Sequence, residues 1–188
     1  MNLGPIINAV SLAWLVSEIV LSRVKHSDAK KSKLDAYSLR ILWTTIALSV
    51  SSGVFLGLRR IGFIATGSYF ISVSGLSLIV IGLIVRWIAI LTLRKYFTVD
   101  VSIVSDHRIV THGLYRWVRH PSYAGSLLSF LGLGICFSCW VSTLVVFLPI
   151  LVAFIYRIRV EEKVLAAYLG DEYGQYSAST KRLIPGVY

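Results

Sequence analysis

The residues best suited to chemistry lie in two polar clusters, each bordering a long apolar run. The first cluster, residues 111–125, contains two histidines, two arginines and three aromatic side chains. Pro121 suits the first position of a helix, where its missing N–H has no helical partner, and it pushes the preceding His120 towards an extended conformation. We therefore expect His120 to lie at the start of a helix. A helix entry with interfacial aromatics and arginines that reach towards water fits the same composition.

The second cluster is Arg157-Ile158-Arg159-Val160-Glu161-Glu162, which places two carboxylates side by side where an apolar run ends. Carboxylates are costly to dehydrate at that depth, so we expect them to face a polar cavity or to bind a cation. Arg157 precedes Glu161 by four residues and shares its helical face. An ion pair between these two side chains on a solvated surface explains the spacing equally well.

Other residue patterns indicate structural roles. Cys136 and Cys139 have the spacing of a redox or metal pair, but no second pair or nearby histidine completes a zinc set, so we expect two small residues at a tight turn and no metal site. Glu18 and Arg86 lie near the ends of their apolar runs, where they either pair or reach towards water. No Walker or H-E-x-x-H motif is present, and Gly132-Leu133-Gly134 favours close helix packing.

The elements that position these clusters are long and apolar. The 188-residue chain is 56% hydrophobic and 15% charged, with a mean hydropathy of +0.74. These values exclude an ordinary soluble domain, a disordered chain and a collagen-like chain. A membrane-spanning helix needs about 20 mostly apolar residues. Five apolar runs are present, at residues 5–21, 41–58, 69–91, 124–137 and 140–156.

These runs predict an all-α, polytopic integral membrane protein with about five transmembrane helices in a single structural domain. Residues 1–92 would hold three of the helices, and residues 93–188 would form the core that contains both polar clusters with the candidate chemistry. Within that core, residues 124–156 are expected to form a helical hairpin, kinked at Pro149. A C-terminal amphipathic helix on the membrane surface is predicted by apolar residues at helical spacing, which are Val160, Val164, Leu165, Tyr168 and Leu169.

The basic residues orient this predicted bundle. The chain has 19 Lys and Arg against 9 Asp and Glu. Seventeen of these cations fall in segments on one side of the membrane, and only Arg59 and Arg60 fall on the other. The positive-inside rule makes the richer side cytoplasmic, which places the N-terminus outside and the C-terminus and active site in the cytoplasm (at the inner membrane in a bacterium). The cations border apolar runs, which favours membrane lipids over nucleic acid as partners.

Sequence blocks in the C-terminal half resemble the isoprenylcysteine carboxyl methyltransferase family. The blocks are 107–115, 119–123, 157–162 and 169–173, followed by Arg182-Leu183-Ile184-Pro185. The resemblance implies a membrane-embedded methyltransferase that uses S-adenosylmethionine without a Rossmann domain and releases S-adenosylhomocysteine. The related phospholipid methyltransferases share the R-H-P-x-Y pattern and the paired glutamates, so the family name alone leaves the substrate open.

The resemblance also implies roles for individual residues. Glu161 would bind a polar group of the cofactor with Glu162 as close support, and Arg157 would lie on the substrate side, so that Arg157 and Glu161 are the expected catalytic residues. The remaining cofactor-binding residues that it implies are Ser102, His107, Arg108, Ile109, Val110, Tyr115, His120, Pro121, Ser122 and Tyr123.

The choice of methyl acceptor depends on Arg157. A carboxylate acceptor is already an anion and needs a cation to hold it, which an arginine does bidentately, whereas an amine acceptor needs a proton removed. We therefore expect carboxyl O-methylation of a lipophilic, isoprenylcysteine-like substrate that enters from the bilayer. The alternatives are an N-methyltransferase for phospholipids or other amines, a non-enzymatic membrane scaffold, and a sterol-reductase-like protein that uses NADPH.

Overall fold

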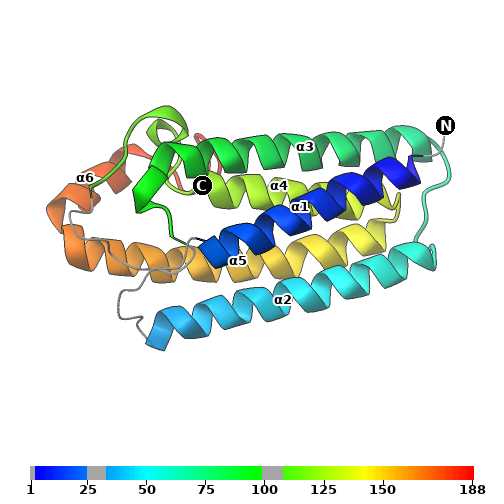
Figure 1. Ribbon diagram of the computed structural model, residues 1–188, viewed down its shortest axis with the longest axis horizontal. Helices are drawn as coiled ribbons and strands as arrows, with labels where there is room; N and C mark the ends of the chain where they lie inside the picture. The colour runs from blue at the N-terminus through cyan, green and yellow to red at the C-terminus, as the bar shows by residue number, and fades with distance from the viewer. Residues whose placement is uncertain (1–2, 25–32, 99–107) are drawn as a thin grey trace.

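The computed structural model describes residues 3–24, 33–98 and 108–188, and every regular element in that part of the chain is helical. Figure 1 shows an elongated bundle in which the long helices run side by side. The elements are α1 (Gly4–Val24), α2 (Lys33–Leu58), α3 (Ser68–Leu93), the short 3-10 helices η1 (Arg94–Tyr96) and η2 (Gly113–Arg116), α4 (Pro121–Cys136), α5 (Trp140–Leu169) and α6 (Asp171–Ser179).

Helices α1, α2, α3 and α5 are long and apolar enough to cross a membrane. Large apolar side chains on their outer faces are exposed, among them Leu48, Phe70 and Val152, as expected for a surface covered by lipid. Helix α4 has 16 residues, which span about 24 Å at 1.5 Å per residue and fall short of a hydrocarbon core of about 30 Å. The chain is therefore a multi-pass membrane protein, and the residues that the structure describes contain four candidate spans and one shorter apolar helix.

Two of the helices extend beyond their apolar runs. Helix α2 begins at Lys33, so Asp35 belongs to its first turn. Helix α5 continues to Leu169, so residues 157–169 form its last turns. The predicted separate amphipathic helix on the membrane surface is therefore wrong for these residues. No glycine or proline interrupts α5 after Pro149, so the helix propagates until Gly170, where a φ of 56° ends it. This extension places both glutamates of the second cluster on one rigid helix.

Glycines bring α3 and α4 together backbone to backbone. A Cβ atom on Gly82 would lie 2.5 Å from the carbonyl oxygen of Gly125, and one on Gly75 would lie 2.7 Å from that of Gly132. Small residues allow this close approach between helices in a membrane. Gly132 therefore serves helix packing, as predicted.

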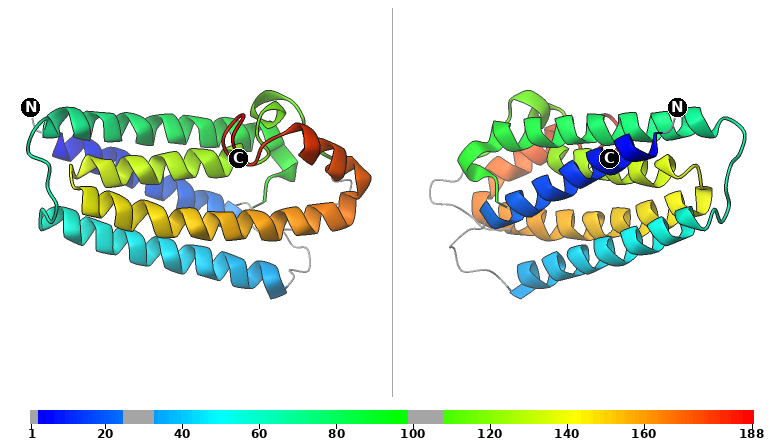
Figure 2. Two further views of the ribbon diagram at one scale, coloured as in Figure 1. Left: turned by 180° about the vertical axis from the view of Figure 1, so that it is seen from behind. Right: turned by 45° about the vertical axis from the view of Figure 1, so that its right-hand side comes forward.

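Helices α4 and α5 form the predicted hairpin. They lie side by side in both views of Figure 2 and are joined by residues 137–139. Cys136 and Cys139 are buried free thiols at this turn, and the Cys139 thiol donates to the carbonyl of Ile61. The two cysteines therefore act as small structural residues at the turn, as the sequence indicated.

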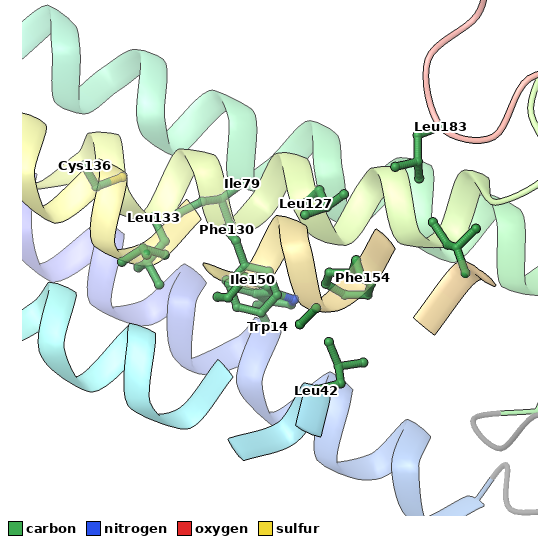
Figure 3. Close-up of a cluster of buried hydrophobic side chains, with 13 residues drawn as sticks. Trp14, Leu42, Ile79, Leu127, Phe130, Leu133, Cys136, Ile150, Phe154 and Leu183 are labelled. Atoms are coloured by element: carbon green, nitrogen blue, oxygen red, sulfur yellow. The ribbon is translucent and has the colours of Figure 1, made fainter. Parts of the chain in front are cut away.

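A cluster of buried hydrophobic side chains in the interior of the bundle contains residues from five helices (Figure 3). Trp14 of α1 packs edge-on against Phe130 of α4, with ring centroids 4.8 Å apart. Leu42 of α2, Ile79 of α3 and Phe154 of α5 complete the contact between the five helices. At the polar end, α6 and the segment leading into α4 lie together, whereas the N-terminus and the α4–α5 turn lie at the opposite end (Figure 1).

Candidate active site

A cavity of about 180 Å³ lies among α1, α2, α4 and α5 and reaches the polar end of the bundle. Both sequence clusters contribute to it. Its polar end is lined by Arg119, His120, Tyr123, Glu161, Tyr173 and Tyr176, and its apolar end by Trp14, Leu42, Ile46, Phe130 and Phe154.

The polar end begins at the start of α4. Pro121 occupies the first helical turn, as predicted, and His120 is the N-cap residue with φ −124° and ψ 55°. The C-terminal tail holds this segment in place: the backbone N–H of Arg119 donates to the carbonyl of Lys181 at 2.7 Å, and that of His120 to the carbonyl of Arg182 at 3.0 Å. The position of His120 therefore depends on residues some 60 positions later in the chain.

Glu162 is the centre of an ion cluster behind the cavity. Its Oε1 atom accepts a hydrogen bond from Arg119 Nε at 3.0 Å and lies 3.2 Å from His120 Nε2. Its Oε2 atom accepts from Arg182 Nε at 2.9 Å, and this hydrogen bond raises the pKa of Arg182 above its ordinary value. Both oxygens of Glu162 are thus bound to protein groups, so Glu162 joins α5 to the start of α4 and to the tail.

Glu161 is the carboxylate that lines the cavity. Its Oε2 atom accepts a hydrogen bond from the Tyr123 hydroxyl at 2.7 Å, and its Oε1 atom lies 3.9 Å from His120 Nδ1. The side chain is 27% exposed, compared with 12% for Glu162. Of the two adjacent carboxylates, Glu161 is therefore the one placed to meet a ligand.

Arg157 lines the cavity one helical turn before Glu161, and its charge is paired with Asp35 of α2. Their side chains are 1% and 0% exposed. Arg157 Nη1 donates to Asp35 Oδ1 at 2.5 Å and to Ser38 Oγ at 2.5 Å. We did not predict either partner, because the sequence assigned both to a polar loop and not to a helix.

A second ion pair, between Glu18 of α1 and Arg86 of α3, also lines the cavity. Arg86 Nη2 donates to Glu18 Oε2 at 2.6 Å. Its Nη1 atom donates to the hydroxyls of Ser122 at 3.0 Å and Ser126 at 2.7 Å on α4. Pairing, one of the two alternatives from the sequence, is therefore confirmed, and it ties α1 to α3 and α4.

Three tyrosines at the polar end stay neutral near pH 7. Burial raises the pKa of Tyr115 and Tyr173 well above the ordinary value and raises that of Tyr176 to about 12, so these phenols donate hydrogen bonds and do not act as bases. The Tyr173 hydroxyl is buried and has no hydrogen-bond partner among the described residues. A buried hydroxyl without a partner is unfavourable, which indicates that a ligand atom completes this wall of the cavity.

The structure brings most of the predicted site residues to one cavity. Pro121 and Glu162 lie directly beside it, and Ser102 and His107 lie outside the described residues. Sequence reasoning missed Trp14 and Tyr173, since nothing in an apolar run or a short helix distinguishes the positions that face a cavity. It missed Asp35 because the sequence assigned that residue to a polar loop. The predicted residues that line the cavity are Arg108, Ile109, Val110, Tyr115, His120, Ser122, Tyr123, Arg157 and Glu161.

The polar end suits a ligand with amino, hydroxyl and aromatic groups. Glu161 accepts hydrogen bonds, the Tyr173 hydroxyl donates one, and the parallel rings of His120 and Tyr123, 5.7 Å apart, provide an aromatic wall. No three His, Cys, Asp or Glu side chains in the described parts of the chain are placed to hold a metal ion.

Comparisons with known proteins identify the family of this chain. The profile of the isoprenylcysteine carboxyl methyltransferase (ICMT) family matches residues 75–167. Protein-S-isoprenylcysteine O-methyltransferase A of Arabidopsis thaliana is 30% identical over 92% of this chain and 87% of its own length. A probable protein-S-isoprenylcysteine O-methyltransferase of Oryza sativa subsp. indica is 32% identical over 62% of each chain.

A solved structure, that of the eukaryotic intramembrane Ras methyltransferase ICMT without a monobody, is 27% identical to this chain with a TM-score of 0.54. That similarity covers 85% of this chain and 55% of the solved one. The matches therefore span less than two thirds of the rice relative and about half of the solved chain.

Proposed function

Because the chain belongs to the isoprenylcysteine carboxyl methyltransferase family, we propose that it is an integral-membrane, S-adenosylmethionine-dependent methyltransferase that esterifies the carboxylate of a lipophilic, isoprenylcysteine-like acid. The observation that carries the proposal is one cavity with a polar end and an apolar end. A polar methyl donor and a lipid tail can meet in such a cavity, where a few polar groups fix the orientation of a mostly apolar ligand.

The polar end supplies the groups that would hold the cofactor. Glu161 would accept hydrogen bonds from its amino or hydroxyl groups, and the Tyr173 hydroxyl would donate to it. His120, Tyr123 and the strip 108–110 would form the walls around it. S-adenosylmethionine, when bound, supplies a methyl group from its sulfonium sulfur, which keeps the electron pair of the broken bond and becomes the thioether of S-adenosylhomocysteine.

Arg157 would hold the acceptor carboxylate in line for the transfer. An arginine has five N–H donors, so its guanidinium can serve Asp35 and a substrate carboxylate at the same time. Asp35 and Ser38 fix the guanidinium, and near-attack alignment of this kind supplies much of the rate of a displacement. The carboxylate oxygen reacts as an anion, so no side chain has to remove a proton.

The arrangement of the bundle supports separate routes for the two ligands. His120, Glu161 and Tyr173 from the C-terminal part of the chain line the polar end, while Trp14, Leu42 and Ile46 of the N-terminal helices line the apolar end. Trp43 lines the cavity and is also 39% exposed, which supports entry of the acceptor sideways from the bilayer. The segments that contain η1, η2 and the C-terminal tail lie at the polar end, and the connection between α2 and α3, which contains Arg59 and Arg60, lies at the opposite end (Figure 1). The polar end would therefore face the cytoplasm and the N-terminus would lie outside.

Labelled methyl transfer tests the proposal. The purified protein in lipid nanodiscs is incubated with methyl-labelled S-adenosylmethionine, an N-acetyl-S-prenylcysteine and phosphatidylethanolamine. We expect the label to enter the acid as a methyl ester, from which mild base releases labelled methanol. N-methyl groups are not released by mild base. Base-stable label on the amine would establish N-methylation instead. Absence of S-adenosylmethionine binding would refute the methyltransferase, and a parallel NADPH titration tests the reductase alternative.

A further inference from the structure

The indole N–H of Trp14 is a buried donor at the apolar end of the cavity. Trp14 lines the cavity and is 6% exposed. Its Nε1 atom has no hydrogen-bond acceptor among the described residues. Figure 3 shows this nitrogen turned towards the side of the cluster where Phe154 and Leu42 lie, and both of these side chains line the cavity. An N–H group without an acceptor is unfavourable in apolar surroundings, so the donor indicates an acceptor atom on the ligand.

Neighbouring rings hold the indole in a defined orientation. Trp14 meets Phe130 edge-on at 4.8 Å, Phe130 lies 6.5 Å from Phe154, and Phe154 lies 5.2 Å from Tyr123. Tyr123 in turn donates to Glu161. This row of rings connects the polar end of the cavity to Trp14, so a ligand that reaches from one to the other passes along it.

The depth of Trp14 limits which ligand atom can meet it. On α5, Phe154 precedes Arg157 by three residues, which places it roughly 4.5 Å deeper at about 1.5 Å per residue. Bonds between carbon atoms are about 1.5 Å long, so an atom three or four bonds from a carboxyl carbon held by Arg157 reaches the level of Phe154. In an S-alkylated, N-acylated amino acid, these positions hold the thioether sulfur and the amide oxygen. A plain fatty acid has only methylene groups there.

We propose that Trp14 Nε1 donates a hydrogen bond to a neutral acceptor atom of the lipophilic acid, a carbonyl oxygen or thioether sulfur, and so selects amino-acid-derived lipids over plain fatty acids. This inference rests on the proposed function and adds a residue that determines its substrate specificity. A neutral acceptor fits better than a second carboxylate, because the cations that line the cavity nearby, Arg86 and Arg157, are paired with Glu18 and Asp35.

Trp14→Phe removes the N–H and keeps an aromatic ring against Phe130. Trp140→Phe is the matched control, since Trp140 is an exposed tryptophan that does not line the cavity. The two acids compared are N-acetyl-S-farnesylcysteine and a branched hydrocarbon acid of equal length. For each acid we measure the KM, or the inhibition constant where the acid binds without being methylated.

We expect Trp14→Phe to raise the KM, or the inhibition constant, of the cysteine derivative about fivefold. This change corresponds to the roughly 1 kcal/mol of one neutral hydrogen bond. The KM or inhibition constant for the hydrocarbon acid, the kcat and the affinity for S-adenosylmethionine should stay within twofold, and Trp140→Phe should leave all of these quantities unchanged. A farnesylthio acid without the amide then identifies the acceptor atom. Trp14→Phe should raise the constant for this acid only if the thioether sulfur accepts the hydrogen bond.

An equal loss on both acids, or no loss on either, overturns the proposal. Because Trp14→Phe also shortens the ring, 3-benzothienylalanine at position 14 provides a second variant of indole shape without the N–H, and it should reproduce the selective loss. The inhibition constants do not require turnover. The two failures are therefore distinguishable. If the proposed function is wrong, no acid forms a methyl ester. If the Trp14 proposal is wrong, Trp14→Phe changes the inhibition constants of the two acids equally or changes neither.

Discussion

Asp35→Asn tests how the buried charge of Arg157 is held. The substitution keeps the shape of the side chain and one oxygen, but it removes the negative charge 2.5 Å from Arg157 Nη1. The guanidinium remains almost fully buried. The backbone carbonyl of residue 35 at 3.1 Å and the hydroxyl of Ser38 at 2.5 Å still accept hydrogen bonds from Arg157 Nη1, and both acceptors are neutral.

Removing one member of a buried ion pair destabilises a protein by about 3–5 kcal/mol. The neutral hydrogen bonds that remain place the expected loss for Asp35→Asn at the lower end, about 3 kcal/mol. In a chain of this length each kcal/mol lowers the Tm by about 2–4 °C, so we expect a fall of about 6–12 °C. The double variant with Arg157→Gln leaves no unpaired charge and should recover part of that loss.

Thermal unfolding of the purified variants in one detergent measures these differences. Asp171→Asn is the control, because Asp171 is exposed at the start of α6 and its loss should change stability by less than about 1 kcal/mol. If Asp35→Asn unfolds no earlier than this control, or if the double variant is less stable than Asp35→Asn, then Asp35 does not compensate Arg157 and α2 does not hold the guanidinium.

Three further predictions follow from the site and its scaffold. Glu161→Ala should weaken S-adenosylmethionine binding at least tenfold in calorimetry, because charged hydrogen bonds contribute about 1.5–3 kcal/mol; unchanged affinity would remove Glu161 from the cofactor site. Arg157→Lys should lower kcat at least tenfold while the cofactor Kd changes less than threefold, because the bidentate geometry is lost, and full activity would refute the carboxylate clamp. Gly82→Ala should destabilise the protein by about 1–3 kcal/mol, because its Cβ would lie 2.3 Å from Ser129 Oγ. The control is Gly174→Ala, where a Cβ meets nothing within 4 Å. Equal Tm values for the two variants in thermal unfolding would contradict the packing argument.

Local patterns in the sequence were sufficient to predict the apolar helices and the two polar clusters that contribute to the cavity. In lipid every backbone polar group must be satisfied within the segment, so long apolar runs predict helices directly, and α1, α3 and α4 follow the predicted runs closely. Pro121 predicted the start of α4 because its ring excludes a helical residue before it. The adjacent carboxylates of Glu161 and Glu162 predicted a polar cavity because ions at that depth are costly to dehydrate.

Only the tertiary structure decided which partner meets each of these residues. Arg157 pairs with Asp35, 122 positions away, and Glu161 accepts a hydrogen bond from Tyr123 on another helix. Hydropathy assigns the same value to an apolar side chain whether it faces lipid or a cavity, so the place of Trp14 could not be predicted. Close packing of α3 on α4 and pairing of charges across helices depend on which surfaces fit together, and that property belongs to the assembled bundle and to no single segment.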